Sequence, residues 1–139
     1  MTRSEIYEFL RAHRWAVEAT TASTGTPQAA VIGFVVSSEL ELFFDTLKSA
    51  RKYQNLRMSP AIALVIGWDD GCTVQYEGVA DEPNGAELDR LKALYFARFP
   101  DGREREELPD IAYIRVKPVW LRYSDFRVTP PIIVERRES

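Results

Sequence analysis

The segment from Thr46 to Arg57 concentrates the side chains that are best suited to chemistry. It carries four basic residues and no acidic one, although the whole chain has a formal net charge of -3. If the segment winds as a helix at about 100° per residue, its apolar and polar side chains fall on separate arcs. The apolar arc holds Ala50, Tyr53 and Leu56, and the polar arc holds Lys48, Arg51, Lys52 and Asn55.

The expected start of this helix, at Thr46 and Ser49, adds hydroxyl groups in the same place. A helix N-terminus presents unpaired N–H groups and a partial positive charge. Hydroxyls, free amides and cations that converge on one point would bind a phosphate monoester. The same pattern also fits a solvent-facing basic helix with a Thr or Ser cap, so the residues alone leave both interpretations open.

Other residue types that support chemistry are scarce. Cys72 is the single cysteine, which excludes an internal disulfide and a cysteine-based zinc site. His13 is the single histidine, which excludes a His-rich site, and we expect no metal. The net charge of -3 argues against nucleic acid as a partner, because binding a phosphate backbone needs an excess of Lys and Arg.

The length of 139 residues predicts a single domain, over residues 1–139, with one core. No apolar run approaches the roughly 20 residues that cross a bilayer. The first 14 residues mix charged and apolar side chains, which is not the pattern of a signal peptide. We therefore expect a cytoplasmic protein with no membrane partner.

Local patterns predict a chain that is mainly β. Strands are expected over residues 15–21, 28–36, 40–44, 61–68, 73–80 and 111–123. The strand over 28–36 is apolar throughout, as expected of a strand that is covered on both faces. The last strand should bend at Pro118, because proline cannot donate to a ladder.

Helix signals frame these strands. Thr2 and Glu5 form a capping box that starts a short amphipathic helix, and Asn84 and Glu87 form a second pair. A loop is expected over residues 103–107, and a C-terminal tail over residues 126–139. Six antiparallel strands would expose edges unless the sheet closed, so we predict a six-stranded antiparallel β-barrel with flanking helices. Such a small barrel has little internal room, and a ligand is expected outside it or between subunits.

The run from Pro27 to Pro60 is similar to the pyridoxamine 5'-phosphate oxidase-like family of FMN-binding split barrels. An apolar strand follows a proline over residues 27–34, and the next strand ends in an aromatic residue and Thr over residues 43–46. A Ser/Lys helix start, an Asn-Leu pair and a proline then follow; these are Ser49, Lys52, Asn55, Leu56 and Pro60. The later pairs Glu77-Gly78 and Lys117-Pro118 also fit. The resemblance covers residues 4 to 125 and implies an FMN-binding split barrel of six strands.

This resemblance implies FMN as the cofactor, bound at the interface of a homodimer. The phosphate would be held by Thr46, Lys48, Ser49, Arg51 and Lys52. The isoalloxazine and ribityl groups would meet Val31, Ile32, Gly33, Phe44 and Asp45. Three further residues are candidates for the pocket: Gln75, Trp120 and Arg122. Alternatively, these side chains pack in the protein or lie at ordinary exposed positions of a strand.

Two departures argue against a true pyridoxamine phosphate oxidase. Such enzymes carry a Gln and an Arg ahead of the Glu-Gly pair, where this chain has Thr73 and Gln75. They also end with an Arg-x-His segment, and residues 128–139 contain no histidine. Vitamin B6 oxidation is therefore not expected, and the generic FMN site is the better prediction.

The preferred hypothesis is an FMN-dependent oxidoreductase that acts on an unidentified small molecule. No side chain is an obvious acid or base, which suits hydride or electron transfer. The alternatives are a non-catalytic stress-related or regulatory module that binds FMN or another phosphorylated ligand, and a related barrel that binds a deazaflavin or haem. Because the polar arc is not expected to pack, replacing Lys52 by Ala should weaken FMN binding about 10- to 100-fold and leave the fold intact.

Overall fold

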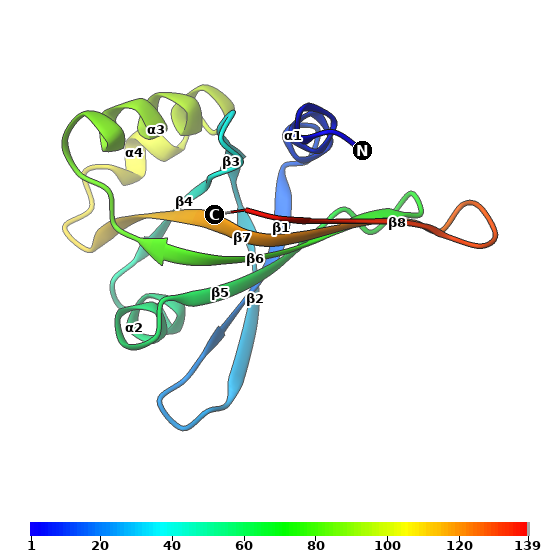
Figure 1. Ribbon diagram of the computed structural model, residues 1–139. Helices are drawn as coiled ribbons and strands as arrows, with labels where there is room; N and C mark the ends of the chain where they lie inside the picture. The colour runs from blue at the N-terminus through cyan, green and yellow to red at the C-terminus, as the bar shows by residue number, and fades with distance from the viewer. Residues whose placement is uncertain (139) are drawn as a thin grey trace.

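A curled antiparallel sheet of eight strands forms the body of residues 1–138, the part of the chain that the computed structural model describes (Figure 1). The strands are β1 (Trp15–Thr21), β2 (Pro27–Gly33), β3 (Val35–Val36), β4 (Leu42–Leu47), β5 (Ala61–Ile66), β6 (Cys72–Asp81), β7 (Ile111–Asp125) and β8 (Ile132–Arg137). The helices are α1 (Arg3–Arg11), α2 (Arg51–Met58), α3 (Gly85–Arg98) and α4 (Gly102–Arg105). The predicted class, a mainly β split barrel with flanking helices, is confirmed, with eight strands instead of six.

The strand order is β2-β1-β5-β6-β7-β4-β3, and β8 pairs with β7 outside this path. All of these strand pairings are antiparallel. Strand β2 therefore lies at one edge of the sheet. In Figure 1, α1, α3 and α4 lie above the long strands, α2 lies below them, and the β7-β8 hairpin projects from the sheet.

Alternation along β6 shows how the sheet builds its core. Val74 and Tyr76 are buried, while Gln75 and Glu77 between and beside them are exposed. The Tyr76 hydroxyl donates to the carbonyl oxygen of Leu40 at 2.7 Å, which satisfies the polar end of this buried side chain. The strand that the sequence predicts over residues 73–80 is confirmed, and the burial of its side chains alternates with a period of two residues.

Proline bends β7 where the sequence predicts a bend. Gly78 of β6 pairs with Pro118, and the ladder then skips Val119, which is the extra residue of a β-bulge. A Cβ atom on Gly78 would lie 2.5 Å from the carbonyl oxygen of Lys117. Only glycine therefore fits opposite the bulge.

One of the two predicted capping boxes is present. The Glu5 N–H donates to Thr2 Oγ1 at 3.1 Å, and the Thr2 N–H donates to Glu5 Oε1 at 2.8 Å. Asn84 is the N-cap of α3 but makes no side-chain hydrogen bond there. The backbone enters α3 through Gly85, whose φ of +60° lies outside the right-handed helical region, so the geometry of a capping box is not formed.

The expected loop at residues 103–107 was wrong, because α4 occupies much of it. Within this short helix, Arg105 forms ion pairs with Asp45 at 2.8 Å and with Asp101 at 2.9 Å. These two contacts fix the turn of the chain after α3.

The expected C-terminal tail was also wrong. Strand β7 continues to Asp125, and this extension gives β8 a ladder to pair with. Across that ladder the Arg122 Nε donates to Glu135 Oε1 at 2.9 Å.

The strand expected over residues 28–36 is divided into β2 and β3, and its β2 part is not covered on both faces. Val31 is 62% exposed. Strand β2 lies at the sheet edge, and no element among residues 1–138 covers its outer face.

Candidate functional site

The helix predicted within residues 46–57 is α2, which begins at Arg51, later than the expected start at Thr46 and Ser49. Thr46 lies in β4, where it pairs with Ala112 of β7, and Ala50 is the N-cap without a side-chain hydrogen bond. The Ser49 N–H donates to Asp110 Oδ2 at 3.1 Å. Neither Thr46 nor Ser49 caps the helix, because the pairing of β4 with β7 fixes the backbone before it.

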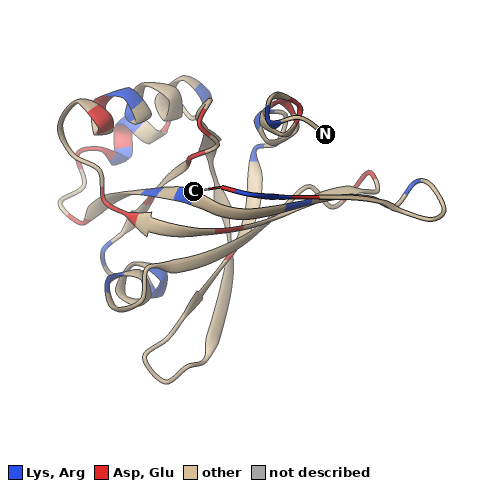
Figure 2. Cartoon of the chain, viewed as in Figure 1, with Lys and Arg blue, Asp and Glu red and all other residues tan. Residues whose placement is uncertain are grey.

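The first turn of α2 faces a small cavity against β1 and β2. The cavity has a volume of about 110 Å³ and is lined by Glu18, Thr20, Gln28, Ala29, Ala30, Arg51 and Lys52. Figure 2 shows that α2 carries Lys and Arg and no acidic residue. Two of the predicted phosphate ligands, Arg51 and Lys52, are thus brought together, while Lys48 is exposed and outside this lining.

Asn55 holds α2 on the sheet beside this cavity. Its Nδ2 donates to Thr20 Oγ1 of β1 and to Gln28 Oε1 of β2, both at 2.9 Å. Asn55 and Thr20 are both buried. The expectation that the polar arc of this helix does not pack was therefore wrong, because Asn55 and Lys52 face β1.

A buried carboxyl group lines the cavity opposite the cations. The Glu18 side chain is 2% exposed, and its Oε1 lies 4.0 Å from Lys52 Nζ. Its Oε2 has no hydrogen-bond partner among residues 1–138. Burial raises the pKa of Glu18, and the positive charge of Lys52 opposes this shift without cancelling it.

Glu18 was not among the predicted site residues. The available signal was the alternation of β1, in which Ala16, Glu18 and Thr20 share one face. That pattern shows the shared face but not that the face is buried.

Phe44 and Asp45 of β4 do not line the cavity beside α2, and of the two Asp45 contacts α3 and α4. Phe44 is fully buried in the core. Asp45 accepts hydrogen bonds from the Tyr95 hydroxyl at 3.0 Å and from Arg105 Nε at 2.8 Å. Burial raises the pKa of Tyr95 to about 12, and the negative charge of Asp45 adds to this shift.

The predicted residues Val31, Ile32 and Gly33 lie in edge strand β2. Val31 is exposed on the outer face, and Ile32 is buried on the inner face. A Cβ atom on Gly33 would lie 2.8 Å from the ring of Phe99, so glycine permits this close approach. On the side away from β1, no strand within the described residues pairs with this backbone.

Gln75, Trp120 and Arg122 lie together on the outer face of the sheet. Gln75 pairs with Arg122, whose guanidinium carbon is 5.5 Å from the Trp120 ring centroid. The register from β6 through β5 to β1 places them on the face opposite to Glu18. Within a single chain, these three residues therefore do not lie at the cavity beside α2.

An apolar groove of about 440 Å³ crosses the outer face of the sheet. Its lining includes Pro27, Ala61, Ala63, Val79 and Val119. A broad exposed apolar surface of this kind is typical of an interaction site.

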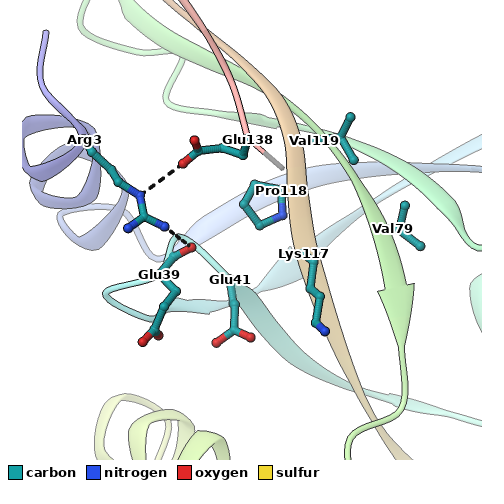
Figure 3. Close-up of a pocket in the computed structure, with 8 residues that line it drawn as sticks. All are labelled: Arg3, Glu39, Glu41, Val79, Lys117, Pro118, Val119 and Glu138. Atoms are coloured by element: carbon teal, nitrogen blue, oxygen red, sulfur yellow. Dashed lines mark hydrogen bonds and ion pairs between the residues drawn. The ribbon is translucent and has the colours of Figure 1, made fainter.

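A larger cavity of about 750 Å³ lies between the start of α1, the turn before β4 and strand β7 (Figure 3). Arg3 crosses it, donating from Nε to Glu138 at 3.1 Å and from Nη2 to the carbonyl oxygen of Glu39 at 3.0 Å (Figure 3). The walls also carry Glu41 and Lys117, so cations and carboxylates are mixed. No pattern in the sequence indicated this cavity, because residues from both ends of the chain line it.

The remaining reactive side chains are isolated. The Nδ1 atom of His13 lies 2.8 Å from the carbonyl oxygen of Phe9, and the Tyr123 hydroxyl donates to Cys72 Sγ at 3.3 Å. Among residues 1–138, no group of three or more His, Cys, Asp or Glu side chains is placed to hold a metal ion. None of the helices described is both long and apolar enough to span a membrane.

The sequence matches the family model of pyridoxamine 5'-phosphate oxidase over residues 2–125. This match covers most of the chain and includes strands β1 to β7, α2 and the cavity beside α2. The chain therefore belongs to this family, as the resemblance of residues 27–60 predicts.

Solved structures share the fold. A haem-binding protein from Mycobacterium smegmatis gives a TM-score of 0.85 at 16% identity, and the match covers 99% of this chain and 58% of that one. General stress protein 26 from Bacillus anthracis gives 0.73 at 19% identity, covering 96% of this chain and 98% of that one. A haem storage protein from Vibrio cholerae gives 0.73 at 21% identity, covering 83% and 88%. No curated protein sequence matches the chain significantly.

Proposed function

We propose that this chain is an FMN-binding flavoprotein that works as a homodimer and catalyses electron or hydride transfer with an unidentified small molecule as its substrate. The observation that carries the proposal is the cavity between α2, β1 and β2, with Arg51 and Lys52 in its lining. Its volume of about 110 Å³ suits a phosphoryl group, and the residues at this end fit FMN with one exception, Glu18.

Arg51 and Lys52 would hold the phosphate by charge-assisted hydrogen bonds. Arg51 is exposed and forms no ion pair within residues 1–138, so its guanidinium is available to an anion. The unpaired side of β2, from Val31 to Gly33, would offer backbone N–H and C=O groups to the polar edge of the ring. When bound, the flavin would supply the redox chemistry, and the chain's residues would bind and orient it.

The apolar outer face of the sheet supports the proposed dimer. Val31, Val65, Val79 and Val119 are all exposed on that side of the molecule, around the 440 Å³ groove. A second copy of the chain would cover this surface. Trp120 and Arg122 lie on the same outer face, so in this dimer they would lie at or near the contact between the two copies.

The test is an FMN titration, followed by flavin fluorescence, of purified protein whose size is measured by light scattering. A hydrogen bond from a charged donor contributes roughly 1.5–3 kcal/mol, so Arg51→Ala should weaken FMN binding about 10- to 100-fold. Arg57→Ala on the same helix is the matched control, because Arg57 is exposed and outside the cavity lining. Equal FMN affinities of the two variants would remove Arg51 from the site, and a protein that takes up no FMN would refute the flavin proposal.

The haem-binding and haem-storage neighbours support a second candidate, a haem-binding module without turnover. An axial ligand would have to come from a side chain such as His13, the single histidine, whose Nδ1 already contacts the Phe9 carbonyl oxygen. Adding hemin to the same protein and to His13→Ala separates the two candidates. A Soret band that depends on His13, together with no FMN uptake, would favour haem.

A further inference from the structure

The cavity beside α2 contains one group that a simple phosphate site would exclude, the carboxyl of Glu18. Its side chain is 2% exposed, Oε2 has no partner among residues 1–138, and Oε1 reaches only Lys52 at 4.0 Å. That distance is too long for a hydrogen bond. A buried carboxylate without hydrogen bonds lowers stability, and a hydrophobic side chain would pack better on this face.

The charged groups around Glu18 are few, so their balance can be stated. Helix α2 supplies Arg51 and Lys52 to the cavity. The neighbouring strands β2 and β5 contain no titratable residue. The polar neighbours Thr20 and Gln28 are neutral, and both accept hydrogen bonds from Asn55.

A phosphate monoester carries up to two negative charges near neutral pH. With the dianion bound, its charge is balanced by Arg51 and Lys52 only when Glu18 is neutral. An ionised Glu18 would repel the phosphate and compete with it for Lys52. A protonated Glu18 would remove that repulsion and could donate its O–H to a phosphate oxygen.

We propose that ionised Glu18 competes with a bound anion for Lys52. A phosphate monoester therefore binds in this cavity together with one proton, which Glu18 takes up. This inference rests on the proposed phosphate site. The proton comes from solvent, and no bond other than the carboxyl O–H forms or breaks. Burial of Glu18 already favours its neutral form, and a bound anion acts in the same direction.

The consequence is a specific pH dependence. Binding linked to uptake of one proton weakens by up to tenfold per pH unit once Glu18 is ionised in the free protein. Between pH 7 and pH 9 the phosphate monoester stays a dianion, because its second pKa is about 6, so the ligand itself does not create such a slope.

The test compares the wild-type chain with Glu18→Gln, in which a neutral side chain of the same shape imitates the protonated acid. FMN affinity is measured by calorimetry from pH 7 to pH 9, and inorganic phosphate is used as a second probe by thermal shift. We expect wild-type affinity to fall with pH and Glu18→Gln affinity to stay flat and exceed it at least tenfold at pH 9. Glu104→Gln makes the same charge change at an exposed position on α4 and should follow the wild type.

The outcomes distinguish failure of the role of Glu18 from failure of the flavin proposal. Parallel pH curves for wild type and Glu18→Gln overturn the role of Glu18 and leave the FMN site standing. A Glu18-dependent response to inorganic phosphate without FMN binding overturns the flavin and keeps the inference. No binding of either probe to either protein overturns both. If Glu18→Gln fails to fold, calorimetry of the wild type at pH 8 in buffers of different ionisation enthalpy decides, since the absence of proton uptake contradicts the proposal.

Discussion

Replacing Asn55 by Ala tests how α2 is held against the sheet. Asn55 Nδ2 donates to Thr20 Oγ1 and to Gln28 Oε1 at 2.9 Å each. Two net hydrogen bonds contribute about 2 kcal/mol, and the buried Thr20 hydroxyl left without its donor adds about 1 kcal/mol. The better helix propensity of alanine offsets about 0.5 kcal/mol of this loss. The expected decrease in the free energy of unfolding is therefore about 2.5 kcal/mol.

The assay for Asn55→Ala is urea unfolding followed by circular dichroism, with the midpoint compared at an unchanged slope. Gln54→Ala is the matched control, because Gln54 is exposed and its single bond, from Nε2 to the Lys48 carbonyl oxygen at 2.9 Å, lies at the surface. This control should change stability by no more than about 0.5 kcal/mol. If the two variants lose the same stability, the view that Asn55 anchors α2 is refuted.

Three further outcomes follow from other parts of the molecule. Burial raises the folded-state pKa of Glu18 above its unfolded-state value, so the free energy of unfolding falls as the pH rises through these two pKa values. Glu18→Gln removes this loss and should therefore stabilise the protein more at pH 8 than at pH 4 in urea unfolding. Gly78→Ala would place a Cβ atom 2.5 Å from the Lys117 carbonyl oxygen, so thermal unfolding should show a loss of at least about 2 kcal/mol, and a near-normal melting temperature would contradict the bulge geometry. Val65→Lys should dissociate the proposed dimer in light scattering, whereas Leu108→Lys, at a comparably exposed apolar position in the loop before β7, should leave it intact.

Features that depend on neighbours in the sequence were predictable. The capping box of Thr2 and Glu5, the alternation of Val74 and Tyr76, and the bend at Pro118 each depend on a few consecutive residues. Local conformational preferences and side-chain periodicity determine these features directly. Family membership was also predictable, because several loose motifs occurred in the right order.

Features that depend on distant pairing were not predictable. Thr46 belongs to β4 because Ala112, 66 residues later, pairs with it, and this pairing moves the start of α2. The apolar pattern of β2 does not reveal that the strand lies at an edge with Val31 exposed. The approach of Glu18 to Lys52 exists only after α2 has packed on β1, so no local pattern could report it.

Strand β7 is long enough to pair with three other strands, β4, β6 and β8. Three ladders therefore depend on this one segment. During folding, the early strands β4 and β6 cannot complete their pairing until residues 111–125 are available, and such non-local pairing is slow. Opening β7 would break all three ladders at once. Its amide hydrogens should therefore be among the slowest in the chain to exchange with solvent, a ranking that hydrogen–deuterium exchange measures directly.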